Sequence, residues 1–311
     1  PSLEEAIKKS GLRDGMTISF HHHFRNGDHI INNVLDKLAE MGFKNLTLAA
    51  SSLSAVHAPL IEHIRSGLIT HIETSGLRGE LAEQISRGLM DFPVVFRSHG
   101  GRASAIRSGE LHIDVAFLGA PSCDPYGNAN GYSRDDDDGI SCGSLGYART
   151  DAEFADKVII ITNNIVSYPN APWAIPEHDV DYVVRVDDIG DPKGIMSGAT
   201  RYTKDPKELL IAKTAANVVE AAGYLYDGFS MQMGSGGASL ATARFIRQKM
   251  LDKGIRCRFA LGGITGQITA MHEEGLIDRI LDVQSFDLDA AKSLKNNHFH
   301  HQISGTYYAS H

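Results

Sequence analysis

Three consecutive histidines, His21, His22 and His23, follow an apolar run that ends at Phe20. Neighbouring side chains of an extended chain point to opposite sides, so we expect His21 and His23 to share a face. A zinc site would need a third ligand and an open position. The candidates for that ligand show no H-E-x-x-H or similar spacing: His57, His99, His272 and the "HFHH" run at 298–301. The pattern therefore favours substrate binding or acid–base chemistry over a metal, and a plain polar turn stays open.

Two glycine-rich segments also follow strand-like runs. They are "MGSGGASLATARFI", which includes residues 234–239, and "ALGGITGQ", which includes Gly262 and Gly263. Glycines let a ligand approach the main chain, and a helix N-terminus offers N–H groups that have no intrahelical partner. The first segment lacks the lysine of a P-loop and the spacing of a dinucleotide-binding loop. Each segment is either a cradle for an anion or oxyanion, or a tight strand-to-helix turn.

Arginines follow two further strand-like runs, in "TSGLRG" and "RSHGGR". These are Arg78, Arg97 and Arg102, with His99 among them. The planar guanidinium group matches a carboxylate with paired hydrogen bonds, so several arginines at one sheet edge indicate an anionic substrate. Solvated surface arginines are the alternative. The acidic run Asp135–Asp138 is typical of a solvated loop, with a divalent-cation site as the lesser option.

These residues need a framework that brings strand ends together. Short apolar runs alternate with segments of helical periodicity, which predicts a parallel sheet covered on both faces. The predicted strands of the first part are Thr17–Phe20, Leu46–Ala49, Ile69–Glu73, Val94–Arg97, Val115–Leu118, Val158–Thr162 and Tyr182–Val186. Ligands bind outside the carboxyl ends of such strands, which is where the histidines and arginines fall.

Capping patterns predict where helices begin. Ser2 followed by Glu5 forms a capping-box pattern, and Asp28 precedes an apolar stripe that stops at Gly42. Two further helices are predicted, at His57–Arg65 and Gly79–Leu89. The segment "CDPYGNANGYSRDDDDGISCGSLG" is rich in Gly, Asn and Asp and is predicted to be a loop.

The segment "DDIGDPKGIMSGATRYTKDP" predicts a domain boundary. Asp205 and Pro206 then begin a helix that runs to about Ala222. The elements predicted after it are strands Phe229–Met233, Arg258–Leu261 and Ile280–Val283, and helices Leu240–Met250 and Leu288–Leu294. We predict one α/β domain over residues 1–204 and the start of a second over 205–311. In both parts a helix is followed by a strand, then by a loop rich in histidine or glycine, and then by a second helix. This shared order indicates a distant duplication.

Composition narrows the function classes. The chain has 311 residues, 42% of them hydrophobic, and a net charge of −8, which is unlike the basic surface of a nucleic-acid binder. No apolar run approaches the roughly 20 residues of a membrane span. Three widely spaced cysteines suit a reducing compartment, so we expect a cytoplasmic protein. The chain starts with Pro1, and we expect a fragment of a longer polypeptide.

Several stretches spread over nearly the whole chain resemble the citrate lyase alpha chain family. They are "GMTISFHHHFRNGD", "TSGLRGELAE", "SHGGRASAIRSGELHIDVAFLGAPSCDPYGNANG", "CGSLGYA", "GSGGASLATARF", "LGGITG" and "QSFD". More remotely, the strand–loop pattern is similar to that of class I CoA-transferases. The resemblance implies an α/β fold of two parallel-sheet, CoA-transferase-like (NagB/RpiA-like) domains in tandem, the second incomplete here because family members are longer.

The resemblance also implies a reaction. Citrate would attack the acetyl thioester of coenzyme A or of an acyl carrier protein bearing a phosphopantetheine-type arm. The resulting mixed anhydride would react with the thiolate to give citryl thioester and acetate. Class I enzymes use a glutamate nucleophile in a Ser-Glu-Asn-Gly turn, whereas the corresponding turn here reads Ala260-Leu261-Gly262-Gly263. No covalent enzyme intermediate is therefore expected at that position.

Roles for individual residues follow from the same resemblance. The expected catalytic groups are main-chain N–H donors and one imidazole, from Gly236, Gly237, Gly262, Gly263 and His99. The expected substrate ligands are His21, His22, His23, Arg78 and Arg102. The thioester carrier is expected at Gly234, Ser235, Ala238 and Ser239. No metal is expected, and the implied partners are the citrate lyase beta chain, the gamma chain (the acyl carrier protein) and further copies in a homo-oligomer.

Three alternatives stay open at this stage. The chain could be a different CoA-transferase, or a carrier transferase associated with a decarboxylase, acting on another di- or tricarboxylate. It could be a metal-dependent hydrolase built on the histidines. It could also be a non-catalytic sensor of sugar-phosphate type, because a fold does not fix a function.

Overall fold

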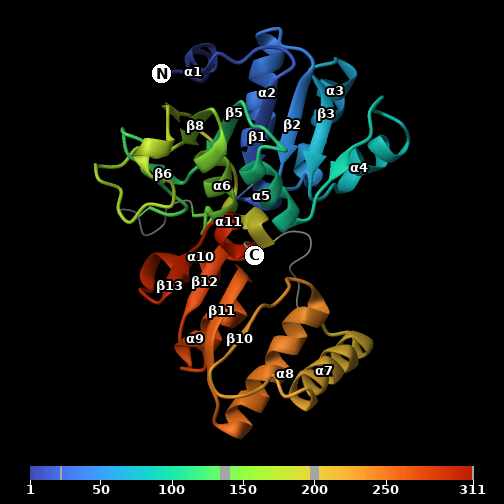
Figure 1. Ribbon diagram of the computed structural model, residues 1–311, viewed down its shortest axis with the longest axis vertical. Coiled ribbons are helices and arrows are strands. Elements are labelled where there is room, and N and C mark those ends of the chain that lie inside the picture. Colours follow the sequence, from blue (N-terminus) through green and yellow to red (C-terminus); the bar gives the residue numbers. More distant parts are fainter. Residues whose placement is uncertain (22, 134–140, 197–202, 310–311) are drawn as a thin grey trace.

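The computed structural model describes residues 1–311 apart from 22, 134–140, 197–202 and 310–311 (Figure 1). Its first unit is a seven-stranded sheet in the order β4-β3-β2-β1-β5-β8-β9. Every neighbouring pair is parallel, and Ile18 of the central strand lies between Leu48 and Val115. The strands are β1 Thr17–His21, β2 Leu46–Ala50, β3 Ile69–Thr74, β4 Val95–Phe96, β5 Val115–Gly119, β8 Lys157–Thr162 and β9 Tyr182–Arg185. The predicted parallel sheet is confirmed.

Six helices surround this sheet in the described residues. They are α1 Leu3–Ser10, α2 Ile30–Glu40, α3 Leu60–Arg65, α4 Gly79–Ser86, α5 His99–Ser108 and α6 Gly146–Phe154. The capping box at Ser2 and Glu5 is present. Single 3₁₀ turns are η1 Arg25–Gly27, η2 Ala55–His57, η3 Glu177–Asp179 and η4 Pro192–Met196. Helices α5 and α6 were not predicted from the sequence.

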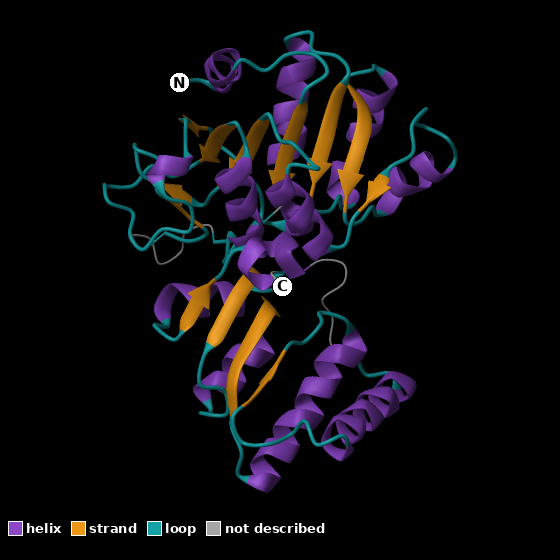
Figure 2. Ribbon diagram, viewed as in Figure 1, coloured by secondary structure: helices purple, strands orange, loops and turns teal. Residues whose placement is uncertain are grey.

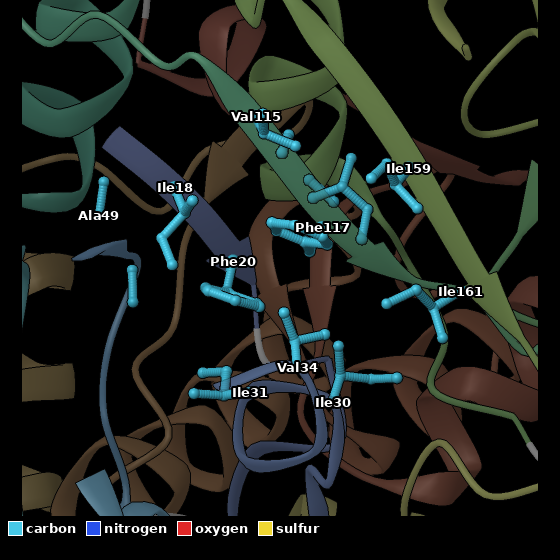
Figure 3. Packing of buried hydrophobic residues seen from close by; sticks show 14 of the residues in the cluster. Ile18, Phe20, Ile30, Ile31, Val34, Ala49, Val115, Phe117, Ile159 and Ile161 are labelled. Atoms are coloured by element: carbon cyan, nitrogen blue, oxygen red, sulfur yellow. The ribbon is translucent and has the colours of Figure 1, made fainter. Parts of the chain in front are cut away.

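The core of the first unit forms where the central strands meet α2. Phe20 of β1 stacks on Phe117 of β5, with ring centroids 5.5 Å apart. Ile30, Ile31 and Val34 of α2 pack against them, and all five side chains are almost completely buried (Figure 3). The alternation of apolar runs with an amphipathic helix therefore produces a sheet whose strand ends are rigidly placed.

The second unit has its own sheet and core. Its strands are β10 Phe229–Met231, β11 Cys257–Ile264, β12 Ile280–Ser285 and β13 His300–Gln302, parallel and in sequential order. Its helices are α7 Pro206–Ala221, α8 Gly237–Lys253, α9 Gly266–Glu273, α10 Leu288–Asn296 and α11 Gly305–Tyr308. Strands β10 to β13 lie side by side in sequential order, as strands β1 to β4 do in the first sheet. Strands β6 Ser122–Cys123 and β7 Ala129–Asn130 form a separate two-stranded antiparallel sheet.

The two sheets point their carboxyl ends toward the same junction (Figure 2). Ser144 crosses this junction, because its hydroxyl donates to the carbonyl of Asp282 at 2.7 Å and its N–H donates to the Ser285 hydroxyl at 3.3 Å. Helix α11 returns to the first unit, where Thr306 hydrogen-bonds Thr150. No described helix has both the length and the apolar character needed to cross a bilayer.

We predict that Gly143→Ala will weaken the junction strongly. Gly143 has φ +79°, and a Cβ there would lie 2.0 Å from Oγ and 2.4 Å from Cβ of Ser285. Gly109 is the matched control, since it also has φ +79° but has nothing within 4 Å of a Cβ. Gly109→Ala should cost about 1–2 kcal/mol for the left-handed backbone alone. Gly143→Ala should cost about 1–3 kcal/mol more for overpacking, measured by urea unfolding. Equal losses would contradict this account of the junction.

Candidate active site between the two sheets

A cavity of about 260 Å³ lies where the strand ends of the two units meet. The first unit contributes residues that follow β1, β2, β3 and β4, and the second contributes residues that follow or end β10, β11 and β12. The lining residues are Arg25, Ser52, Ser54, Ser75, Gly76, Arg78, His99, Tyr147, Gln232, Met233, Gly234, Ser235, Gly263, Val283, Gln284, Phe286 and Tyr308. The cavity therefore occupies the position where parallel sheets bind ligands.

Five of the predicted site residues are brought together in this lining: Arg78, His99, Gly234, Ser235 and Gly263. The other predicted glycines are not part of it. Gly236 is the N-cap of α8, and Gly237 is buried in its first turn. Gly262 has φ +101° and packs against the Gln232 side chain, and Ala238 and Ser239 belong to α8. The glycine segment thus reaches the cavity with its first two residues.

The histidine run lies behind the cavity wall. His21 and His23 are buried, and their rings meet edge to face with centroids 4.3 Å apart. His21 hydrogen-bonds the Ser51 hydroxyl through Nδ1. The Tyr147 ring, which does line the cavity, lies 5.4 Å from His21 and 5.6 Å from His99. His22 lies outside the described residues. His21 therefore packs against Tyr147 from within the protein, and His23 packs against His21.

Burial determines the charge of His23. Desolvation, opposed by a weaker interaction with the Ser144 backbone, lowers the pKa of the His23 imidazole to about 3. His23 is therefore neutral at physiological pH. Desolvation is also the largest cause that lowers the pKa of His99, followed by the positive charges of Arg102 and Arg78. His99 at the cavity is thus a neutral imidazole, able to accept or donate one hydrogen bond at each nitrogen as its tautomer dictates.

The structure corrects the assignment of Arg102. Its side chain is buried inside α5 and makes a paired ion bridge to Asp151 of α6, with both N···O distances 2.7 Å. Asp151 is completely buried. Arg102 does not line the cavity, although residues three apart share a helix face, because Asp151 holds its guanidinium in the protein interior. We therefore remove it from the candidate substrate ligands.

Arg25, in the loop after β1, takes the place that Arg102 was expected to fill. It lines the cavity together with Arg78, and its guanidinium lies over the Phe286 ring at 4.9 Å from the centroid. Desolvation, and after it the charge of Arg78, lowers the pKa of Arg25 to about 10. Arginine side chains are cations at neutral pH, and no Asp or Glu is among the lining residues. The described cavity is therefore positive and suits an anion.

A bulge in β12 shapes the second wall. Gly262 pairs with Asp282 and Gly263 pairs with Gln284, so Val283 is the extra residue. A Cβ at Gly263 would lie 2.0 Å from the Phe286 ring, which shows how closely this ring covers the main chain. Gln232 donates to the Tyr308 hydroxyl at 2.5 Å across the cavity mouth. Gln284 and Phe286 belong to the "QSFD" stretch that carries the family resemblance, but the sequence analysis gave them no role. Gln232 and Tyr308 had no signal in the sequence.

The other histidines considered as metal ligands do not lie beside the histidine run at residues 21–23. His57 pairs with Asp28, His272 with the Ile277 carbonyl, and His300 with Asp282. Among the described residues, the one cluster with metal-ligating geometry is His112, Asp114 and Asp156. It precedes β5 and β8, at the opposite edge of the sheet from the cavity, and Asp114 already accepts from the Thr17 N–H at 2.7 Å. The acidic run at 135–138 lies outside the described residues.

The comparison with known protein families agrees with the geometry of the cavity. The family model "citrate lyase, alpha subunit (CitF)" matches residues 1–311. The chain belongs to the citrate lyase alpha subunit family. It is 58% identical over 309 residues to the citrate lyase alpha chain of Haemophilus influenzae, covering 99% of this chain and 61% of that relative. The chain thus spans about three fifths of the length of the curated relatives it matches.

Solved structures agree with this family membership. A structure assigned as the alpha subunit of citrate lyase from Streptococcus mutans, in complex with citrate, is 56% identical, with a TM-score of 0.93 over 99% of this chain and 60% of that one. A 4-hydroxybutyrate CoA-transferase from Porphyromonas gingivalis is 17% identical, with a TM-score of 0.60 over 99% of this chain and 67% of that one. The predicted family and the predicted CoA-transferase-like α/β fold are confirmed.

We predict that Arg102→Gln will destabilise the chain by about 3–5 kcal/mol, because it leaves the buried Asp151 carboxylate without its partner. The double change Arg102→Met with Asp151→Leu should recover most of that loss, since it removes both charges. Arg107→Gln, on the exposed side of the same helix, is the control and should stay within about 0.5 kcal/mol. Chemical unfolding measures all three. Unchanged stability of Arg102→Gln would return Arg102 to the ligand candidates.

A second prediction concerns pH. The pKa of His23 is about 3 in the folded chain and about 6.5 when unfolded, so the unfolded state binds the extra proton between these values. Stability should therefore fall as pH falls below 6.5. We expect the wild type to lose about 2 kcal/mol more than His23→Asn between pH 6.5 and 4.5. The exposed His298→Asn is the control and should follow the wild type. Parallel curves for wild type and His23→Asn would refute the assignment of a neutral, buried imidazole.

Proposed function

We propose that this chain transfers the thiol carrier of an acetyl thioester to citrate. Acetyl thioester and citrate would give citryl thioester and acetate. The observation that carries the proposal is the cavity itself, which joins two arginines, a neutral histidine and exposed main-chain glycines in a member of this family. The structure assigned as a citrate lyase alpha subunit from Streptococcus mutans was solved with citrate, which supports the choice of acceptor.

The acceptor would bind through its carboxylates. The Arg78 guanidinium provides paired donors at the start of α4, and Ser52, Ser54 and Ser75 add hydroxyl groups beside it. Charged hydrogen bonds of this kind hold a polycarboxylate in one orientation, which converts an encounter between two substrates into a reaction of fixed geometry. His99 at the same wall is neutral and could bind the citrate hydroxyl or the departing sulfur.

The chemistry needs stabilisation of developing charge. A citrate carboxylate oxygen bonds to the acetyl carbonyl carbon, and the carbon–sulfur bond breaks to release thiolate. Thiolate then attacks the citryl carbonyl of the mixed anhydride and expels acetate. Because a carboxylic acid and a thiol differ by about four pKa units, the first step is uphill by roughly 6 kcal/mol. Each well-aimed oxyanion donor contributes about 3–4 kcal/mol, and the main chain at Gly234, Ser235 and Gly263 borders the cavity.

The absence of an acylated enzyme group is part of the proposal. The carboxylates nearest in sequence to the second wall belong to Asp282 and Asp287. Both make hydrogen bonds within the protein, and neither lines the cavity. Asp282 is buried between Ser285 and His300, at 2.6 and 3.1 Å. Asp287 caps α10 and accepts from the Gly266 N–H at 2.7 Å. We infer that acyl transfer is direct.

The carrier and the assembly are proposed on family grounds. The thioester would be borne by coenzyme A or by the phosphopantetheine-type arm of an acyl carrier protein, with its sulfur near residues 234–235. The partners would be the beta and gamma chains of a citrate lyase complex and further copies of this chain, in the cytoplasm. No metal is assigned a role.

Isotope transfer in a single turnover tests the direct route. With enzyme in excess over acetyl-CoA and citrate carrying ¹⁸O in its carboxylates, direct attack predicts one ¹⁸O atom in the acetate of the first turnover. A glutamyl or aspartyl intermediate would give unlabelled first-turnover acetate, and this result would overturn the mechanism. Malonate and acetoacetate serve as competing acceptors, and preference for either one over citrate would redirect the substrate assignment.

We further predict that Arg78→Gln will reduce kcat/KM for citrate by about 10–100-fold, because charged hydrogen bonds contribute roughly 1.5–3 kcal/mol. Arg87→Gln, at the other end of the same helix and exposed, is the matched control. The initial rate of citrate-dependent acetate release measures both variants. An equal effect of the two changes would place citrate elsewhere.

A further inference from the structure

Tyr147 lines the cavity but has no role in the reaction proposed above. It is the second residue of α6 and belongs to the "CGSLGYA" stretch. The residue is only 8% exposed, and its hydroxyl makes no hydrogen bond with any described residue. That oxygen is not among the enclosed polar atoms of the described residues, so it opens on the cavity. A nearly buried side chain therefore offers an unused polar group to a ligand.

Contacts from both units hold the Tyr147 ring. In the first unit, its centroid lies 5.4 Å from that of His21 and 5.6 Å from that of His99. In the second unit, Gly305 of α11 comes so close that a Cβ on it would lie 3.0 Å from Cδ1 of the ring. Packing on several sides leaves the ring little freedom to turn. The hydroxyl is thus preorganised, as a group that stabilises charge in a transition state must be.

The start of α6 also touches the second wall of the cavity. A Cβ on Gly146 would lie 2.6 Å from the carbonyl oxygen of Val283, the extra residue of the β12 bulge, which lines the cavity. The main chain at residues 234–235 and at Gly263 borders the same cavity from the second unit. A carbonyl oxygen bound there could accept from main-chain N–H groups of one unit and from the Tyr147 hydroxyl of the other.

Burial keeps the Tyr147 phenol protonated. Desolvation, and after it the neighbouring Tyr308, raises the pKa of Tyr147, while the positive charge of Arg102 lowers it by less. The phenol is therefore a neutral hydrogen-bond donor at physiological pH. A neutral donor meets a developing oxyanion without the cost of removing a full charge from water. Such a donor is most effective in a site from which bulk water is excluded.

We propose that Tyr147 is a catalytic residue whose hydroxyl donates a hydrogen bond to the carbonyl oxygen of the bound acetyl thioester. This inference rests on the proposed function and adds a group to its first step. A carboxylate oxygen bonds to the carbonyl carbon, and the π electron pair moves to the carbonyl oxygen. When that pair returns, the carbon–sulfur bond breaks and thiolate leaves. Tyr147 keeps its proton throughout and acts by binding the oxyanion more strongly than the ground-state carbonyl.

Removal of the hydroxyl alone tests this role, because Tyr147→Phe keeps the ring and its contacts. Its kcat for acetate release from acetyl-CoA and citrate should fall about 100–1000-fold, as when one oxyanion donor is lost. The KM for each substrate should change by less than about twofold. Tyr182→Phe is the matched control and should equal the wild type, since the Tyr182 hydroxyl donates to the Lys9 carbonyl outside the cavity. An unchanged kcat, or a loss confined to KM, overturns the assignment.

Infrared spectroscopy of bound acetyl-CoA, labelled with ¹³C at the carbonyl carbon, measures the hydrogen bond without turnover. Because a hydrogen bond weakens the C=O bond, the stretch should lie at lower frequency in the wild-type complex than in Tyr147→Phe. Tyr147→fluorotyrosine keeps the hydroxyl and makes it more acidic, so it should lower the frequency further. This variant carries the test if Tyr147→Phe does not fold.

The spectra separate this inference from the proposed function. A wild-type chain that shows the shifted band but transfers no acyl group to citrate keeps the Tyr147 assignment and rejects the proposed reaction. Transfer to citrate with the same band in wild type and Tyr147→Phe rejects the assignment and keeps the reaction. A chain that binds no acetyl-CoA rejects both.

Discussion

Contact between main chains at the junction of the two units is the constraint on which the cavity depends. A Cβ on Gly146 would lie 2.1 Å from the Ile303 carbonyl oxygen and 2.6 Å from that of Val283, and a Cβ on Gly143 would lie 2.0 Å from the Ser285 hydroxyl oxygen. Only residues without a side chain permit that approach. The approach places the carboxyl ends of β1 to β4 opposite those of β10 to β12. Without it, each sheet would present half a site to solvent.

Buried polar groups behind the wall follow from the same arrangement. The ion pair of Arg102 with Asp151 joins α5 to α6, and these two helices carry His99 and Tyr147 to the cavity. An isolated buried charge is costly, so the pair is stable only as a pair. The buried His23, whose ring meets that of His21, avoids that cost by remaining neutral. The buried polar groups therefore make the cavity wall rigid, whereas the net charge of the cavity comes from Arg25 and Arg78.

The sequence predicted most strands of the first sheet, but not which arginines line the cavity. Apolar runs and their spacing are local signals, and they located β1, β2, β3, β5 and β8 well. Helix α5 was missed because Gly100 and Gly101 stand in its first turn, although Ser98 caps it. Interpreted as a loop, "RSHGGR" presented His99 and Arg102 alike, whereas in the structure Asp151 holds the Arg102 guanidinium in the interior. The Arg25 guanidinium donates to the carbonyl of Ile195, far away in the chain, and no local pattern contains that information.

The two units use the same topological position for different chemistry. The turn after β1 and the turn after β10 each follow the first strand of a β-α series, and both border the cavity. The first turn presents a cation, Arg25. The second is glycine-rich, and its main chain at Gly234 and Ser235 borders the cavity before α8 begins. An anion bound by side chains on one wall would thus face polarising N–H groups on the other. Two sheets with the same strand order and different first turns are therefore sufficient, under the proposed function, to place a carboxylate beside a carbonyl that it could attack.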